Sequence, residues 1–486
     1  MQFNYFVFFF AFLPVTVLLY HLANKIHYTV GKLVFIAASL VFYAYSDVSA
    51  LLFIGASLAA NYLCACLLRR RMDNKLSSAR IFLIIPLVIN IGLLVYFKYT
   101  GFILSCFNVV LDGSNTLANL ILPLGISFIT FQQIAYVVSV YRHEIEAVSL
   151  IDYLAYILYF PKILMGPLAE PADFIGQLND ASRKKFDSAN LARGLQIFSF
   201  GLFKKVMLAD VFALAVNSCF EHLNTVSSLD LVFVMLFYTF EIYFDFSGYS
   251  DMAVGSSLML NITLPINFDS PYKALSIRDF WKRWHISLTK FFTKYLYIPL
   301  GGSRKGKLLT YVNTMIVFAV SGLWHGANWS FILWGVLHGL FMVFDRVFEK
   351  QEAKIPKPIR WLLTFALVNI LWLLFRAESI PTWTRILKKI FSLSGMYISF
   401  ELANNFVLPE VPFLTKLFHI GAITEAIPNF WLYFYTLAAL LLCLIPKNSY
   451  RRMDKLTLSS MLLAAVVFAW SMLSLGNESL FVYFTF

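Results

Sequence analysis

Long apolar runs recur along the chain and limit what it can fold into. Phe3–Tyr20, Leu51–Leu68, Ile81–Phe97 and Trp431–Ile445 each approach the roughly 20 residues that cross a bilayer as a helix. Only 14% of the 486 residues are charged, against about 25% in an average soluble domain. The sequence therefore predicts an all-α polytopic membrane protein, residues 1–486 forming one integral domain of about 11–13 transmembrane and re-entrant helices.

The basic residues are grouped between the apolar runs. Lys25 and Lys32 flank the first predicted loop, Arg69–Lys75 follows the third run, and Lys447–Lys455 precedes the last one. The positive-inside rule places such groups in the cytoplasm. Counting spans from these loops predicts that both termini lie outside the cytoplasm. The net charge of +12 is then a consequence of topology and does not indicate nucleic-acid binding.

The middle of the chain is less regular. Ile151–Gly166, Met252–Leu264 and Asp279–Pro299 are too short or too polar for plain spans. Broken helices at membrane depth are tolerated only where protein or water surrounds them, so we expect a cavity here. The five cysteines lack any spacing that suggests a metal site or a disulfide framework.

Three carboxylates follow an apolar run in the stretch EIYFDFSGYSDM, which begins at Glu241. Glu241 and Asp245 share a helix face because they are one turn apart, and Asp251 follows. An ionisable group inside the membrane costs about 2.5–3.5 kcal/mol on insertion scales and usually marks function. This makes the three carboxylates candidates for a supporting role in a functional site.

A structural role for the same carboxylates stays open. Gly248 could break the helix, and the carboxylates could then cap the next segment. They could also pair with Arg278 or Arg283, which lie further along the chain.

The next segment, Arg278–Arg304, has the pattern of a basic amphipathic helix lying in the cytoplasmic interface. Its apolar stripe on the helical wheel consists of Trp281, Trp284, His285, Leu288, Phe292 and Tyr295, and its basic side of Lys282, Arg283, Lys290 and Lys294. His285 is the one titratable group on the apolar stripe. By spacing alone, such a histidine is more often a satisfied core residue than a catalytic one.

A third motif, SGLWHGANW, places His325 directly after an apolar run, between Gly322 and Gly326. Glycines at such positions let another backbone or a substrate approach closely. His338 follows further along and would point away from His325 if the helix were continuous. We therefore interpret His338 as structural.

These stretches, together with YIPLGGSR, closely resemble the membrane-bound O-acyltransferase (MBOAT) superfamily, specifically its AlgI- and PatA-like branch of bacterial polysaccharide O-acetyltransferases. The best motifs lie in residues 241–339. The resemblance implies a ring of helices around a central funnel in the bacterial inner membrane, where a cytoplasmic acyl donor meets an acceptor from outside. By position, His325 matches the family's catalytic histidine and His285 its second functional histidine.

The chemistry suits these residues. Acyl transfer from a thioester to a hydroxyl needs a base, and histidine, with a free pKa near 6.5, can serve at neutral pH. His285, Trp324 or a backbone amide near Gly326 could stabilise the oxyanion. The resemblance implies acetyl-CoA or an acylated carrier protein as donor substrate, with no bound cofactor and no metal.

Four basic residues are candidates for binding the phosphates of that donor: Lys282, Arg283, Arg304 and Lys305. Ordinary positive-inside topology explains their charge equally well.

The chain ends in FVYFTF, residues 481–486. Its phenylalanines can act as an anchor at the outer membrane–water boundary. Phe481, Tyr483 and Phe486 also match an FxYxxF pattern found in some relatives. There the tyrosine is implied to carry the acyl group to an extracytoplasmic SGNH-type partner, which modifies an exported polysaccharide.

Two alternatives stay open. The same enzyme class could transfer D-alanine or a longer acyl chain. The chain could instead be a transporter or flippase of an acylated or lipid-linked sugar, with the intramembrane carboxylates as substrate or proton sites.

Overall fold

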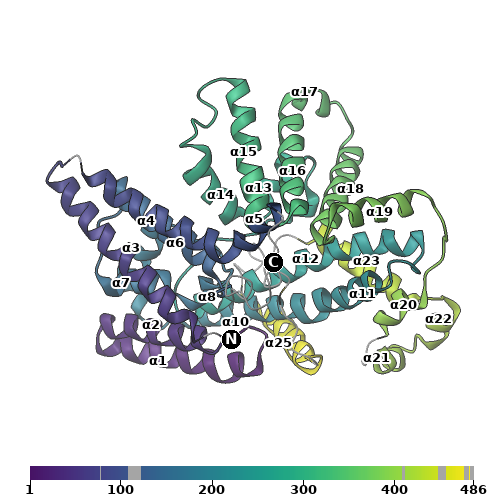
Figure 1. Ribbon diagram of the computed structural model, residues 1–486. Helices are drawn as coiled ribbons and strands as arrows, with labels where there is room; N and C mark the ends of the chain where they lie inside the picture. Colours follow the sequence, from purple (N-terminus) through teal and green to yellow (C-terminus); the bar gives the residue numbers. More distant parts are fainter. Residues whose placement is uncertain are drawn as a thin grey trace. The chain divides into compact units, whose positions relative to one another are not determined.

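A computed structural model describes residues 1–46, 48–76, 78–107, 122–407, 411–446, 456–475 and 481 (Figure 1). Helices dominate this part of the chain, and no strand occurs within it. The structure is therefore the all-α fold that the apolar runs predict, because a helix satisfies all its backbone hydrogen bonds within one segment.

The helices of the N-terminal part are α1 (Leu13–Ile26), α2 (Tyr28–Ala44), α3 (Ala50–Asp73), α4 (Ala79–Leu94), α5 (Thr100–Cys106), α6 (Ile126–Tyr141), α7 (Leu150–Ile157), α8 (Phe160–Ile163), α9 (Pro171–Asn179) and α10 (Ser188–Phe203). Those of the middle part are α11 (Asp210–Glu221), α12 (Ser228–Met259), α13 (Ile277–Arg283), α14 (Ile286–Phe292), α15 (Lys307–His325), α16 (Trp329–Val347), α17 (Glu349–Glu352) and α18 (Lys357–Arg376). The C-terminal part adds α19 (Ile380–Phe391), α20 (Phe400–Ala403), α21 (Val411–Leu417), α22 (Gly421–Ala426), α23 (Phe430–Leu444) and α25 (Leu458–Leu473).

The chain divides into two compact units, both discontinuous in sequence. The first consists of Met1–Phe200, Tyr249–Ile266 and Lys455–Val466. The second consists of Gly201–Gly248, Asn267–Asp454 and Val467–Phe486, and it contains both histidine motifs. Whether the units act as one integral domain around a funnel stays a prediction.

Six described helical stretches are long and apolar enough to cross a membrane, and four shorter apolar helices of 10–17 residues accompany them. The six include the stretches Phe8–Ile26 and Ala79–Cys106 as well as the helices α3, α15, α16 and α18. The prediction of a multi-pass membrane protein is confirmed. The segment predicted to be irregular, Ile151–Gly166, is also broken, since α7 and α8 are separate short helices.

The first predicted loop is corrected by the structure. Lys32 does not flank a loop but lies buried within α2, where its ammonium pairs with Asp152 and donates to Asn179 Oδ1 at 2.6 Å. The first helix runs on to Ile26, so His27 alone connects α1 to α2. Because a buried lysine needs a partner, Lys32 holds elements of the first unit together and is not a loop charge.

The predicted break at Gly248 is wrong, because α12 continues through this residue from Ser228 to Met259. Gly248 instead permits close packing: a Cβ there would lie 2.8 Å from the carbonyl oxygen of Gly201 and 3.2 Å from the amide nitrogen of Lys205. The glycine therefore brings α12 against the π-helix Lys204–Ala209.

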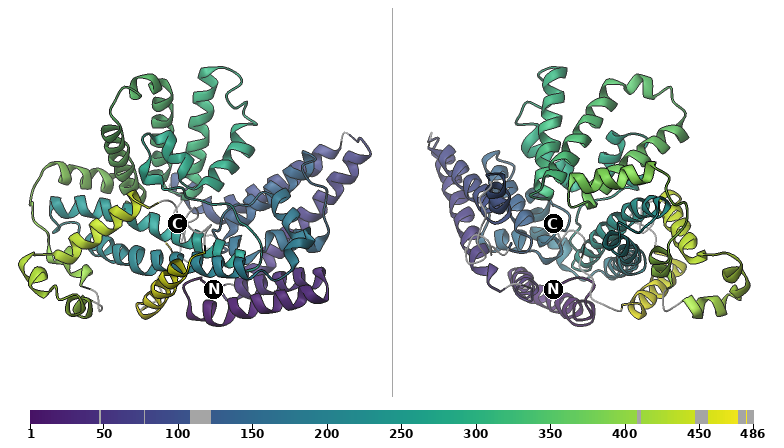
Figure 2. Two further views of the ribbon diagram at one scale, coloured as in Figure 1. Left: turned by 180° about the vertical axis from the view of Figure 1, so that it is seen from behind. Right: turned by 45° about the vertical axis from the view of Figure 1, so that its right-hand side comes forward.

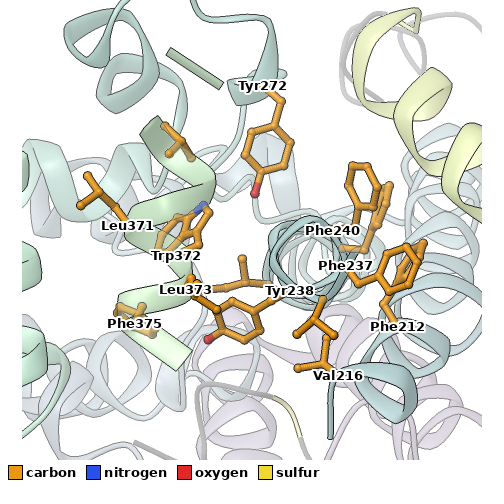
Figure 3. Packing of buried hydrophobic residues seen from close by; sticks show 14 of the residues in the cluster. Phe212, Val216, Phe237, Tyr238, Phe240, Tyr272, Leu371, Trp372, Leu373 and Phe375 are labelled. Atoms are coloured by element: carbon orange, nitrogen blue, oxygen red, sulfur yellow. The ribbon is translucent and has the colours of Figure 1, made fainter. Parts of the chain in front are cut away.

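The core of the second unit packs around α12 (Figure 3). Phe237 and Phe240 lie towards Phe212 of α11, with ring centroids 5.2 and 5.4 Å from it. Tyr238 lies on the side of α18, which contributes Trp372 and its neighbours. A hydrogen bond of 2.7 Å from Thr239 Oγ1 to Asn369 Oδ1 ties α12 to α18. This frame supports the histidine-bearing helices.

Candidate active site

His325 is the last residue of α15, at the tip of a tight helical hairpin with α16. The two helices lie side by side in every view (Figures 1 and 2). A Cβ on Gly335 would lie 2.3 Å from the carbonyl oxygen of Phe318 and 3.0 Å from Cα of Gly322. Small residues at such a contact let two membrane helices approach backbone to backbone. The predicted close approach at Gly322 is thus a helix–helix contact within the protein.

The turn after His325 is shaped by its neighbours. A Cβ on Gly326 would lie 2.2 Å from the ring of Phe331, so this ring folds back over the turn only because Gly326 has no side chain. Asn328 then caps α16, since its Oδ1 accepts from the Ser330 amide at 3.0 Å. Helix caps of this type set where a helix begins. The local sequence GANWS therefore ends one helix, starts the next and leaves His325 between them.

The interpretation of His338 rested on a continuous helix, which the hairpin rules out. His338 lies within α16, fully buried, and its Nδ1 pairs with Trp281 Nε1 at 3.2 Å. Its ring also lies 4.7 Å from that of Trp334, which in turn lies 5.2 Å from the ring of His325. His338 thus joins α13 to α16 and supports the packing around His325.

His285 lies at a break that the predicted single helix Arg278–Arg304 does not have. Helix α13 ends at Arg283, α14 begins at Ile286, and His285 adopts the left-handed conformation with φ 44° and ψ 52°. Non-glycine residues adopt this conformation at a cost and persist in it only when their surroundings hold them there. The break turns His285 into the buried interior, where only 1% of it is exposed.

Asn267 holds this strained turn, and the sequence analysis missed it. Its backbone oxygen accepts from the Ile286 amide at 2.9 Å. Its side-chain Oδ1 accepts from the amide and the hydroxyl of Ser287, at 3.2 and 2.6 Å. The only sequence signal was an asparagine in an irregular stretch, which is typical of ordinary turns.

The two histidines are linked through one indole. The ring of Trp324 lies 4.7 Å from that of His325 and 6.4 Å from that of His285. Phe246 of α12 closes the far side of His285 at 4.7 Å, and Phe375 of α18 lies 5.2 Å from His325. Four segments that are distant in sequence therefore converge on one buried histidine pair. Dry aromatic walls of this kind strengthen the electrostatic interactions made inside them.

The carboxylates lie on α12 but do not use the predicted arginine partners. Asp245 pairs with buried Lys205 at 2.8 Å, and Lys205 also pairs with Asp210 at 2.9 Å. Glu241 lies buried one turn earlier on α12. Asp251, in contrast, belongs to the first unit. Lys205 is a second residue that sequence analysis missed, because its partner is distant in sequence.

Arg278 and Arg283, the expected partners, are engaged elsewhere. Arg278 pairs with Glu349 at 3.1 Å. Arg283 pairs with Asp279 at 2.8 Å and donates to the carbonyl of Asp269 at 3.2 Å. Arg283 therefore stabilises the turn before His285.

The other three donor-binding candidates are all exposed. Lys282 lies on α13, three residues before His285. Arg304 and Lys305 precede α15, whose 19 residues span about 28 Å before His325 is reached. Any contact of Arg304 or Lys305 with a donor would thus be far from its reacting end.

Of the C-terminal motif, the structure describes Phe481 alone, and Tyr483 and Phe486 lie outside the described residues. Phe481 is fully buried, and its ring centroid lies 4.4 Å from the ammonium of Lys205. The ring of Phe481 is thus inside the second unit and not at a lipid interface, where the anchor interpretation put it.

Comparisons with known proteins define the class. The model of the MBOAT, membrane-bound O-acyltransferase family matches residues 89–379. The chain belongs to this family and is a membrane-bound O-acyltransferase. This agrees with the resemblance in the sequence motifs and favours an enzyme over the transport alternative.

Individual relatives narrow the branch. The chain is 40% identical over 425 residues to the peptidoglycan O-acetyltransferase of Helicobacter pylori, covering 81% of this chain and 80% of that protein. It is 37% identical over 405 residues to the probable alginate O-acetylase AlgI of Pseudomonas aeruginosa, covering 82% and 76%. A teichoic acid D-alanyltransferase of Streptococcus thermophilus is 26% identical over 260 residues, covering 51% and 61%. The polysaccharide O-acetyltransferase branch is thus the better match.

The role of Asn267 can be tested by mutation. Asn267→Ala removes the acceptor of two hydrogen bonds at the His285 turn, so the turn should relax and acyl transfer should fall about tenfold or more. Asn190→Ala is the control, since Asn190 bonds Asn261 in the first unit. Rates per folded protein should be compared with those of His285→Ala. If the double variant transfers the acyl group no more slowly than His285→Ala alone, Asn267 acts through His285.

Proposed function

We propose that the protein transfers an acetyl group from a cytoplasmic thioester donor across the membrane for O-acetylation of an exported or cell-wall polysaccharide. The observation that carries this proposal is the buried pair of His325 and His285 joined by Trp324. The names of two relatives, a peptidoglycan O-acetyltransferase and a probable alginate O-acetylase, support the acetyl group and the polysaccharide acceptor.

In the proposed first step, the phenol of Tyr483 attacks the thioester carbonyl. His325 accepts the phenolic proton, the new C–O bond forms, and the C–S bond breaks. The released thiolate then takes the proton from His325. His285 or the indole N–H of Trp324 stabilises the oxyanion while it exists, because the two buried rings lie only 6.4 Å apart.

In the proposed second step, a polysaccharide hydroxyl attacks the acetyl-tyrosine ester. The phenolate leaves more readily than a sugar alkoxide would, since the pKa of a phenol is about 10. An extracytoplasmic SGNH-type partner supplies the base for this step and selects the polymer. The proposed donor is acetyl-CoA or an acylated carrier protein, with the protein in the bacterial inner membrane and both termini outside the cytoplasm.

Purified protein in lipid nanodiscs tests the first step directly. Incubation with acetyl-CoA labelled on the acetyl group should release free CoA and leave label on the protein, and peptide mapping should locate the label in residues 481–486. If neither CoA nor acylated carrier protein gives turnover in the presence of the partner and polymer, the proposal fails.

Tyr483→Phe separates a carrier from an anchor. The substitution removes one hydroxyl and keeps the aromatic ring, so it should leave stability unchanged and abolish both tail labelling and transfer to the polymer. Phe486→Leu is the matched control in the same tail. If Tyr483→Phe acetylates polymer at the normal rate, the phenol is not the carrier.

Transfer of D-alanine is a second candidate, favoured by the match to teichoic acid D-alanyltransferases over about half of the chain. A competition experiment between the acetyl donor and D-alanyl carrier protein decides between acetyl transfer and D-alanyl transfer. Under the acetyl proposal, D-alanyl carrier protein neither acylates the tail nor slows its labelling by the acetyl donor.

A further inference from the structure

Lys205 carries an unusual arrangement for a lysine in a membrane protein. Its side chain is 2% exposed, and it lies between Asp245 of α12 and Asp210 at the start of α11, with N–O distances of 2.8 and 2.9 Å. It belongs to the π-helix Lys204–Ala209. Single π-helical turns inside α-helices occur frequently at functional sites.

The third neighbour of this ammonium is a ring from the end of the chain. The ring centroid of Phe481 lies 4.4 Å from Lys205 Nζ, and Phe481 is 0% exposed. A cation near the face of an aromatic ring is attracted by the ring quadrupole, and the attraction grows when water is excluded. Two carboxylates orient the ammonium, so the ring meets a charge that is already fixed in place.

A second contact brings the C-terminal part of the chain to the same place. Trp470 of α25 lies against Phe203, two residues before Lys205, with ring centroids 6.3 Å apart. Trp470, Phe203, Lys205 and Phe481 all belong to the second unit. The end of α25 and the first residue of FVYFTF therefore both contact the junction between α10 and the π-helix.

We propose that Lys205, held by Asp245 and Asp210, is the docking point of the C-terminal tail and positions its tyrosine for acylation. Phe481 stands two residues before Tyr483 in the sequence, so a contact that holds Phe481 acts directly on the start of the motif. Lys205 is then a positioning residue that acts through Phe481. The positioning of Tyr483 for acylation rests on the proposed carrier role of this tyrosine. The docking of Phe481 on Lys205 does not depend on that role.

Docking can be measured without any turnover. Serine replaces the cysteines with exposed or half-exposed side chains, which are Cys64, Cys66 and Cys106. Tyr483→Cys then supplies a thiol that reports on access to position 483. Phe481→Leu keeps an apolar side chain and both ion pairs of Lys205 but removes the ring. In nanodiscs it should raise the rate at which a maleimide reacts at position 483 by roughly tenfold. Lys205→Met should raise the rate at least as much, and Lys204→Met, a neighbour on the same π-helix, should not.

The acylation readout uses the chain with Tyr483 restored. Phe481→Leu and Lys205→Met should each slow labelling of Tyr483 by about tenfold, with the apparent KM for the thioester donor unchanged. Lys205→Met leaves Asp245 and Asp210 without their ion-pair partner and could prevent folding. In that case, the result for Phe481→Leu alone decides the test.

The outcomes distinguish docking of the tail from the acyl-carrier role of Tyr483. If Phe481→Leu changes neither the maleimide rate nor Tyr483 acylation, the docking proposal is overturned. If Phe481→Leu exposes position 483 while Tyr483→Phe acetylates polymer normally, docking stands and the carrier role falls.

Discussion

His325→Ala should lower acyl transfer by about 10²–10⁴-fold, the range typical of losing a general base. His325 lies at the tip of the α15–α16 hairpin, 5% exposed, with Trp324, Trp334 and Phe375 around its ring. In the proposed first step, its removal leaves the attacking phenol without a proton acceptor. The measurement is single-turnover release of thiol from the donor by folded, nanodisc-embedded protein.

His338 provides the contrast for this prediction. It lies on the neighbouring helix and bonds Trp281, so His338→Ala should lower the melting temperature more than His325→Ala does. Its activity per folded molecule should fall much less. A His325→Ala protein that keeps more than a tenth of wild-type turnover would exclude His325 as the base.

Gly335→Ala should have the second largest effect, although it adds a single methyl group. That methyl would lie 2.3 Å from the Phe318 carbonyl oxygen, on backbone that cannot rotate away. The hairpin must therefore separate, at a cost of about 1–3 kcal/mol for overpacking. Because the same hairpin presents His325, transfer should fall together with stability.

Gly92→Ala is the matched control, since a Cβ there meets nothing within 4 Å. Alanine favours a helix over glycine by about 1 kcal/mol, so Gly92→Ala should be neutral or slightly stabilising. Melting in detergent and turnover in nanodiscs measure both effects. Equal melting temperatures for the two variants would mean that the α15–α16 contact is looser than the structure has it.

Several features of the site could be predicted from the sequence because they are local. The apolar helix α15 and the position of His325 at its end follow from an apolar run that ends in glycines. The stripe containing Trp281 and Trp284 is buried as its periodicity indicates. Local hydrophobic pattern is the strongest signal that a single sequence carries.

Other features could not be read from the chain. Asp245 pairs with Lys205, forty residues earlier, and not with Arg278 or Arg283, which follow 33 and 38 residues later. His285 sits in a left-handed turn because Asn267 accepts from the residues that follow it. Helical periodicity predicts where a side chain points only if the helix is continuous. The helix is in fact broken at residues 284–285 and 326–328, so the orientations predicted for His285 and His338 do not apply.

The division follows from the physics of each interaction. Sequence alone determined the membrane class and several of the spans, and its motifs predicted the two histidines, since hydrophobic length and motif spacing are local properties of the chain. Only the tertiary structure decided which charges pair, where helices break and how Trp324 joins His285 to His325. The burial of Phe481 on Lys205 belongs to this second group, because only folding brings this cation and this ring together, and their attraction is stronger out of water.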